Sequence, residues 1–581
     1  GRQAGAPTQQ DRRHRAAARQ PGRPFRMQTN ISTPASWAAE KGAGWTRSRT
    51  GVLLLLGAVL FLLLPLVVTR IPPLVDYPNH LARMHILSGL GDDAVLARMY
   101  DASWSLIPNL LMDLLVVPLA QVVPLDVAGR LFIGLAILAP VLGTVALHRA
   151  WSGGWHAWPW VSALVAYNAL LSFGLLNYVA GIGLALCGAA WFAMRRPVSL
   201  PRDIAVAVLL GLVCLVSHLI AFAVLLLLAG STLLGRLRAT ERAALLRQAV
   251  VLGAMTVVPL AAYVLLGPSQ NYASGVSPAE LAAQIQERGL LADAGRRLQW
   301  MIAAFTAEGV GNALTWLSAL FAFGVVAAAL LRGRLRIAAE AWAALVLLAG
   351  GYLLLPDVLA DNAMVYQRLV LPLTLVGIAA IRPQLPLRAW RVAVAVWALL
   401  VVARGGAQAV EWSDQNRLLR DVHNVAQAIE PGARVLAVRD GTHVYHVDPG
   451  ERGAQRVLRR TVAYTHLPAL VTLERDAFWP LVFAMGGKQP ITVTPAYASL
   501  SQSDGYLPLT HQLADAADMP GAAEGCRLHP ATVNAPPCHT WDWPGRYDYV
   551  LRLNVQGGAP PDPRLQPIGV SGFAALYRVA R

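Results

Sequence analysis

Four polar side chains of different chemistry lie close together after the first apolar segment of the chain. They are Asp76, Asn79, His80 and Arg83, within the eight residues Asp-Tyr-Pro-Asn-His-Leu-Ala-Arg. A carboxylate can accept a proton from an attacking hydroxyl or amine, and an arginine can bind a phosphate through two parallel hydrogen bonds. The spacing therefore indicates a catalytic site, with Asp76 as the base and the other three as substrate-binding residues. A second interpretation is a capped surface helix with Pro78 in its first turn.

Another polar group precedes a late apolar segment. Tyr366 and Arg368 begin the run Tyr-Gln-Arg-Leu-Val-Leu-Pro, and we expect both to contact substrate. Asp357 and Asp361 come shortly before them, as a second acidic cluster or as solvated loop charges. His218 lies at a turn between two apolar segments, where its imidazole could contact a phosphate or bond to the backbone.

No cofactor motif accompanies these residues. The chain has no Walker motif, no Rossmann glycine signature and no His-Glu-x-x-His pair. Use of a nucleotide sugar from the cytoplasm is therefore unsupported, and neither a cofactor nor a set of metal ligands is predicted. A divalent metal ion stays an open alternative, because some carboxylate sites of this kind bind one.

Two of the four cysteines lie in the polar C-terminal part of the chain. We expect a disulfide between Cys526 and Cys538, which suits an oxidising periplasm. The alternative is a zinc site that adds His529 and His539, since two cysteines and two histidines can hold zinc. The other two cysteines fall in apolar segments.

The composition indicates what must position these residues. Of the 581 residues, 55% are hydrophobic and 14% are charged, whereas soluble domains carry about 25% charged residues. No Asp, Glu, Lys or Arg occurs from residue 151 to 194 or from 204 to 235, and a helix needs roughly 20 apolar residues to cross a membrane. The net charge of +16 lies largely in the N-terminal tail and in short loops, as is typical of cytoplasmic loops. The high pI therefore does not indicate binding of nucleic acid.

Eleven transmembrane segments are predicted, and the arginines of the loops set their orientation. Arg47 and Arg49 precede the first segment and place the N-terminus in the cytoplasm. The segments are 51–69, 131–147, 158–173, 179–194, 204–216, 219–234, 250–266, 313–331, 341–355, 369–381 and 393–402. Residues 70–128 and 267–309 then form outer loops. In the first of these loops, 104–125 is interpreted as one or two helices on the membrane surface, with Asp113 facing water.

Three regions follow from this pattern. Residues 1–50 are predicted to be a disordered basic cytoplasmic tail, in which Met27 is an alternative natural start. Residues 51–404 form the transmembrane domain, and 405–581 form a periplasmic α/β domain. Strands are expected there at 434–440, 491–497, 547–554 and 573–579, and a helix at 411–429. The fold class is thus an α-helical polytopic protein of a bacterial inner membrane with a small C-terminal α/β soluble domain.

This arrangement resembles the GT-C superfamily of membrane glycosyltransferases, which includes the protein O-mannosyltransferases and the aminoarabinose transferases of lipid A. The shared features are one span, a long outer loop that begins with an acidic residue, surface helices and many further spans. The pair Gly129-Arg130 is similar to the start of the family's second span, and Arg368 with Pro372 is similar to the start of a late one. Many members carry an Asp-Glu pair in the first loop, where this chain has Asp76 followed by tyrosine.

The resemblance implies transfer of a sugar from a polyprenyl-phosphate donor to an extracytoplasmic glycan, lipid or protein. Asp76 would act on the acceptor, and Arg368 would lie near the donor phosphate. A lipid or glycan transporter or flippase is the first alternative, and it would require ionisable groups in mid-span. A non-catalytic scaffold that presents the periplasmic domain is the second, and substitution of Asp76 or Arg368 would then be silent.

Overall fold

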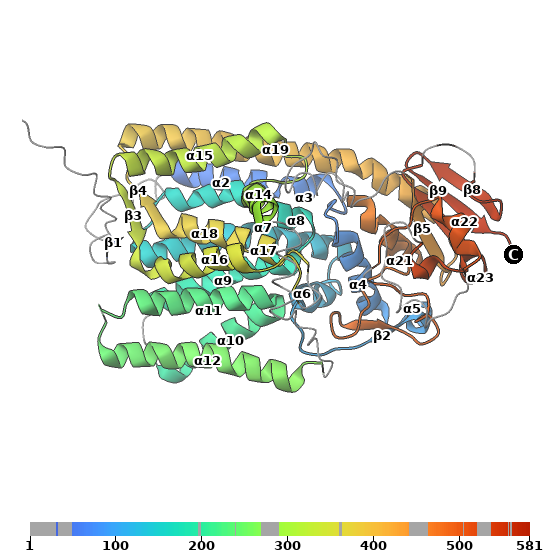
Figure 1. Cartoon of the computed structure of the whole chain (residues 1–581), viewed down its shortest axis with the longest axis horizontal. Coiled ribbons are helices and arrows are strands. Elements are labelled where there is room, and N and C mark those ends of the chain that lie inside the picture. Colours follow the sequence, from blue (N-terminus) through green and yellow to red (C-terminus); the bar gives the residue numbers. More distant parts are fainter. Residues whose placement is uncertain are drawn as a thin grey trace, which may run out of the picture.

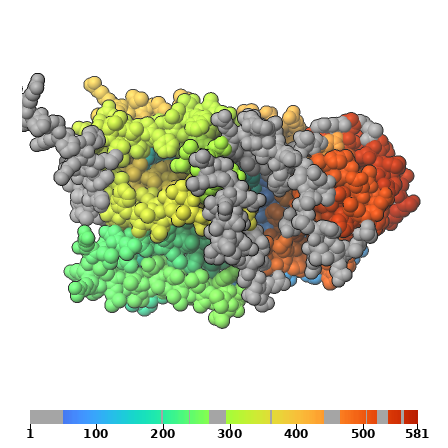
Figure 2. Space-filling view, in the orientation of Figure 1, coloured from blue at the N-terminus to red at the C-terminus, as the bar shows by residue number. Residues whose placement is uncertain are grey.

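The computed structural model describes residues 31–32, 49–195, 199–238, 240–268, 290–359, 363–440, 463–503, 505–519, 536–555, 557 and 560–581. These residues form a bundle of helices at one end of the molecule and a domain with a β-sheet at the other (Figure 1). Figure 2 shows one elongated body, with the red C-terminal residues at the end opposite the green helices of the bundle.

Seven described helices are long and apolar enough to cross a membrane. They are α2 (Arg49–Leu63) continued by α3 (Pro65–Val68), α7 (Leu125–Ser152), α9 (Leu176–Met194), α10 (Leu200–Ser217), α12 (Arg242–Leu266), α15 (Asn312–Leu331) and α19 (Leu387–Ala426). Shorter apolar helices accompany them: α11 (Leu219–Gly235), α16 (Trp342–Leu354), α17 (Val365–Arg368) and α18 (Val370–Ala380). Large apolar side chains cover the outside of the bundle, and Leu56, Val264 and Leu331 are 61%, 79% and 82% exposed. Such a surface suits lipid chains rather than water, so the prediction of a polytopic membrane protein is confirmed.

The predicted span 158–173 is not a regular helix. The chain returns between α7 and α9 through a 3-10 helix, η1 (Trp158–Val165), and a single turn, α8 (Ala169–Ser172). Both lie buried in the bundle, where Ser162 Oγ donates to the carbonyl of Pro159 (2.7 Å) and Asn168 Nδ2 to that of Val165 (3.0 Å). Irregular backbone is tolerated at membrane depth where protein surrounds it. This crossing therefore depends on the helices around it.

The loop between the first and second membrane helices contains short elements. They are α4 (Tyr77–Gly89), α5 (Ala94–Met99), β2 (Tyr100–Ala102) and α6 (Leu111–Leu119). With nine residues, α6 is too short to cross a membrane. The expectation that Asp113 on this helix faces water is wrong, because its side chain is buried against Arg83.

The helix α19 joins the bundle to the sheet domain (Figure 1). Its 40 residues form one helix, about 60 Å long at 1.5 Å per residue. The helix predicted at 411–429 is therefore the second half of the last membrane helix rather than a separate element.

The sheet of the C-terminal domain has four strands in the order β5-β7-β9-β8. The strands are β5 (Val435–Arg439), β7 (Tyr549–Leu553), β8 (Leu565–Ser571) and β9 (Ala574–Val579). β5 and β7 are parallel, and the other two pairs are antiparallel. Three of the predicted strands are confirmed here. The fourth, at 491–497, is the short strand β6 (Ile491–Val493), which lies outside this sheet.

Two contacts hold the loop 70–128 against the C-terminal domain. The strand β2 pairs antiparallel with β6, with Tyr100 opposite Val493. The helix α4 packs on the 3-10 helix η4 (Ala463–Ala469) and on α21 (Leu470–Arg475). The start of α4 is therefore positioned from both sides, by the membrane bundle and by the C-terminal domain.

The opposite end of the bundle has a small sheet in the order β1-β3-β4. It is formed by β1 (Ile31–Ser32), β3 (Leu335–Ala338) and β4 (Ile381–Pro383). Ile31 and Ser32 belong to the segment predicted as a disordered tail, and they pair with β3. The remainder of that tail up to residue 48 lies outside the described residues.

Candidate active site

Asp76 lies directly before α4, at the end of the bundle that faces the sheet domain. The chain around it is held by backbone hydrogen bonds from Val75 N to Ser172 O (3.0 Å) and from Asp76 N to Phe173 O (3.2 Å). Gly174, which follows Phe173 in the chain, has φ +86°. A Cβ placed on it would lie 2.7 Å from the Asp76 nitrogen and 2.9 Å from the Asp76 Cβ. Only glycine fits so close to the carboxylate. The turn after α8 thus fixes where Asp76 stands.

A histidine from the C-terminal domain contacts this carboxylate. Nε2 of His466, on η4, lies 3.3 Å from Oδ1 of Asp76. On the other side of the ring, Nδ1 of His466 lies 3.1 Å from Nδ2 of Asn79. The imidazole therefore bridges the two residues that the sequence places three positions apart.

Asn79 determines which nitrogen of His466 carries the proton. Its Oδ1 accepts from the backbone N–H of Phe483 (2.8 Å), and its Nδ2 donates to the carbonyl of Leu481 (2.7 Å). These bonds fix the orientation of the amide, so His466 Nδ1 receives an N–H and must be the acceptor. In the neutral ring the proton then lies on Nε2, which faces Oδ1 of Asp76 at 3.3 Å. The imidazole thus lies against one carboxylate oxygen of Asp76, and a carboxylate held in this way can act as a base.

His80, one helical turn after Asp76, is buried beside the same group. Its ring packs edge-on against Phe483 at 5.3 Å between centroids. Burial, and next the charge of Arg83, lower the pKa of His80 to about 3, although Asp76 acts in the opposite direction. At neutral pH His80 is therefore uncharged and cannot neutralise an anion.

Arg368 and His218 form a second polar group on the bundle side. Nη1 of Arg368, at the end of α17, lies 3.2 Å from Nε2 of His218, at the junction of α10 and α11. His218 Nδ1 accepts from the backbone N–H of Ile220 (3.1 Å), so the proton of the neutral imidazole lies on Nε2. In the described part of the chain, two N–H donors thus face each other without an acceptor.

The guanidinium of Arg368 has no carboxylate within ion-pair distance among the described residues, and its buried Nε has no hydrogen-bond partner there. Tyr178 donates its hydroxyl proton to the Arg368 carbonyl and so holds the backbone in place. Asp76 attracts the guanidinium electrostatically. A buried cation is unfavourable without a counter-charge, and an anionic oxygen that accepts from both facing donors would supply it. The arrangement can therefore bind a phosphate within electrostatic range of Asp76.

Two of the predicted site residues are engaged elsewhere. Arg83 forms a bidentate ion pair with Asp113 at 2.8 and 2.9 Å, with both side chains at most 1% exposed. Tyr366 lies under the guanidinium of Arg297, 4.2 Å from its ring centroid. Both residues are buried against these partners, so neither side chain is free to contact a substrate. Asp357 accepts a hydrogen bond from the neighbouring Gln367 (2.5 Å).

The cysteine and metal hypotheses concern a region that is described only in part. Cys538 is disulfide-bonded, while its predicted partner Cys526 lies outside the described residues, as do His529 and Asp361. His539 is buried and contacts Gln502 Oε1 at 2.8 Å, and burial lowers the pKa of His539 to about 3. No group of three or more potential metal ligands occurs among the described residues.

The residue that sequence reasoning missed is His466. It lies in Tyr-Thr-His-Leu-Pro, almost 400 positions after Asp76, and no motif or periodic pattern links the two. A histidine in a polar domain gives no signal of its own. The one clue in the sequence was that the segments containing Asp76 and His466 were both predicted to lie outside the membrane, on the same side, where they can meet.

Comparison with known proteins adds little. No protein-family model and no curated protein matches the chain. Among solved structures, the chain is similar to ArnT from Cupriavidus metallidurans bound to undecaprenyl phosphate, with a TM-score of 0.46 and 14% sequence identity over 91% of this chain and 98% of that one. At this identity and TM-score the match carries no functional information about the chain.

Proposed function

We propose that the chain is a membrane glycosyltransferase that moves a sugar from a polyprenyl-phosphate donor to an acceptor outside the cytoplasm. The observation that supports this most directly is the facing pair of donors, Arg368 Nη1 and His218 Nε2, within electrostatic range of the carboxylate of Asp76. A cationic group for a phosphate and a base for an acceptor proton are the two requirements of such a transfer.

The reaction follows from these positions. The acceptor oxygen or nitrogen attacks the anomeric carbon of the sugar, and the bond from that carbon to the phosphate oxygen breaks. The electron pair of this bond leaves with the polyprenyl phosphate, whose charge Arg368 and His218 stabilise. Asp76 takes the proton of the acceptor, while His466 and Asn79 hold the carboxylate in place. His80 lines the site as a neutral residue.

A transporter is the less favoured alternative, because the ion pairs between the described membrane helices lie at helix ends, and the buried Arg404 of α19 donates to the carbonyls of Tyr167 and Phe305. Arg236, at the end of α11, pairs with Glu340 at 3.3 Å. Arg247, near the start of α12, pairs at 3.1 Å with Asp203 in the first turn of α10. A path through the membrane requires ionisable groups in mid-span. The polar groups near Asp76 instead favour chemistry at the end of the bundle.

The binding of a polyprenyl phosphate tests the proposal. Arg368→Ala in the purified full chain should weaken binding of undecaprenyl phosphate by about 1.5–3 kcal/mol, roughly 10- to 150-fold, as for the loss of hydrogen bonds to a charged group. Arg332→Ala, at the opposite end of the bundle, is the matched control and should bind as the wild type does. Equal affinity of all three proteins would remove the basis of the proposal.

The orientation is proposed as well: the N-terminus in the cytoplasm, and the sheet domain in the periplasm of a bacterial inner membrane. The disulfide at Cys538 supports an oxidising compartment. A reporter that is active only in the periplasm should therefore be active when fused to Arg581. Activity of a cytoplasm-only reporter at the same position would contradict this orientation.

A further inference from the structure

A cavity that no residue of the Asp76 site lines is present where the first membrane helix meets the sheet domain. Its volume is about 320 Å³. Ile71, Leu419 and Leu470 contribute apolar side chains to its lining, and the exposed residues Arg70 and Arg420 contribute cationic ones. The cavity thus combines an apolar interior with a cationic rim.

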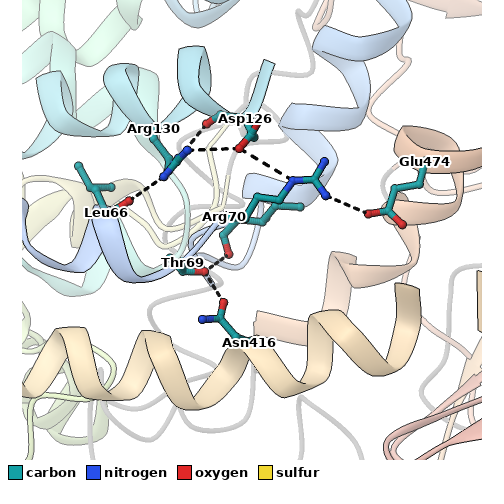
Figure 3. Close-up of polar contacts among 8 residues, drawn as sticks. Leu66, Thr69, Arg70, Asp126, Arg130, Asn416 and Glu474 are labelled. Atoms are coloured by element: carbon teal, nitrogen blue, oxygen red, sulfur yellow. Dashed lines mark hydrogen bonds and ion pairs between the residues drawn. The ribbon is translucent and has the colours of Figure 1, made fainter. Parts of the chain in front are cut away.

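Arg70 is only loosely held (Figure 3). It lies 3.9 Å from a carboxylate oxygen of Asp126 and 3.9 Å from one of Glu474, and its side chain is 63% exposed. Both carboxylates have closer partners, because Arg130 lies 3.3 Å from Asp126 and His423 lies 2.8 Å from Glu474. A separation of 3.9 Å is too long for a hydrogen bond. The N–H donors of Arg70 can therefore turn to a ligand.

Arg420 adds a second positive charge. It is exposed on α19, and no ion pair involves it within the described residues. Among the residues that line the cavity, Glu474 is the one carboxylate, and His423 already contacts it. The rim therefore has more positive than negative charge.

The cavity lies next to the end of a candidate membrane span. The first candidate span ends at Val68, two residues before Arg70. Asn416 of α19 binds this end of the span, since its Nδ2 donates to the Val68 carbonyl (2.9 Å) and its Oδ1 accepts from the Thr69 hydroxyl (2.6 Å). The rim is thus fixed just beyond the end of this candidate span, the level at which the phosphates of a bilayer are expected.

We propose that this cavity binds the phosphate of an anionic membrane phospholipid, with Arg70 and Arg420 on the phosphate and the apolar walls against the glycerol and the first chain carbons. The site is separate from the Asp76 group and does not depend on the proposed reaction. A lipid held there would join the first membrane helix, α19 and α21 at the junction of the two domains.

Native mass spectrometry of the full chain in detergent tests the proposal, with dioleoyl phosphatidylglycerol and dioleoyl phosphatidylcholine as probes. The tightest phosphatidylglycerol site should weaken about fivefold in Arg70→Gln or in Arg420→Gln and roughly 25-fold in the double variant, since each arginine near an anionic surface contributes about 1 kcal/mol. The control is Arg417→Gln, one turn earlier on α19 and not part of the cavity, which should bind as the wild type does. Equal unfolding temperatures show that the variants are folded.

Three results would overturn the proposal. Phosphatidylcholine could bind as tightly as phosphatidylglycerol, so that the arginines do not select an anion. The double variant could bind phosphatidylglycerol as the wild type does. Glycerol 3-phosphate could displace the lipid at equal concentration, in which case the occupant is a soluble phosphate. Asp76→Asn should leave lipid binding unchanged, so a failure of the proposed reaction does not affect this test.

Discussion

Replacement of Asp76 by asparagine should lower the rate of sugar transfer by roughly 100- to 10,000-fold, the usual contribution of a positioned base. The amide has the shape of the carboxylate but cannot take up the acceptor proton. The rate would be measured as consumption of lipid-linked sugar by membranes of cells that lack the native chain and express the variant. Surface glycans give a second readout.

The control for this variant is donor binding. Asp76 lies 3.3 Å from His466 and is not part of the donor pair of Arg368 and His218, so Asp76→Asn should still bind undecaprenyl phosphate. Two variants of His466 then test the positioning contact. His466→Gln keeps an N–H near Nε2 and should retain more activity than His466→Phe, by roughly 2- to 10-fold for one hydrogen bond. Wild-type glycan levels in Asp76→Asn would exclude Asp76 as the base.

Replacement of Arg83 by methionine should destabilise the protein by about 3–5 kcal/mol, because it leaves the carboxylate of Asp113 buried without a partner. Both side chains of this pair are at most 1% exposed. The measurement is thermal unfolding in detergent. Arg578→Met breaks the exposed pair with Glu430 (54% and 66% exposed) and should leave the unfolding temperature close to that of the wild type, because solvent screens such a pair.

Two further results identify the cause of this loss. The double variant Arg83→Met/Asp113→Leu removes both charges and should recover most of the stability. Burial raises the pKa of the Asp113 carboxyl above its ordinary value of 3.8, and Arg83 acts against this. Without Arg83, the Asp113 carboxyl of the folded protein takes up a proton at a higher pH than it does in the unfolded chain. The loss of unfolding free energy relative to the wild type should therefore shrink as the pH falls toward 3.8. A deficit that is equal at all pH values, or that persists in the double variant, would contradict the buried-charge explanation.

Hydropathy predicted the membrane helices well and failed where an apolar segment is not a regular helix. Residues 158–173 are as apolar as any span, but Pro159 and the cap at Asn168 interrupt the helix, and surrounding protein buries the result. Hydropathy measures the cost of contact with water and does not report backbone geometry. For the same reason, hydropathy did not predict that the last span and the helix after it form the single helix α19. The composition changes near Gly405, yet the helix continues through it, and Gly405 allows a direct approach to the backbone of Phe61.

The candidate site could be predicted where a single segment shows both the type of the polar side chain and its position next to an apolar span. Asp76 and Arg368 follow or precede apolar spans, so their place near a membrane end was evident. Arg83 was expected to bind phosphate, but a charge in an apolar surrounding is most stable with a partner, and Asp113 supplies one. No local pattern reveals such a partner 30 residues away, and none reveals His466.

The pairing of Asn79 with the C-terminal domain also bears on the biogenesis of the protein. The partners of Asn79 lie 387 to 404 positions further along the chain, whereas the segments around Arg368 and His218 are synthesised earlier. A nascent chain that has inserted its helices but has not yet reached residue 466 therefore lacks the imidazole that contacts Asp76. The Asp76 group can be completed only after the last membrane helix, α19, has been synthesised.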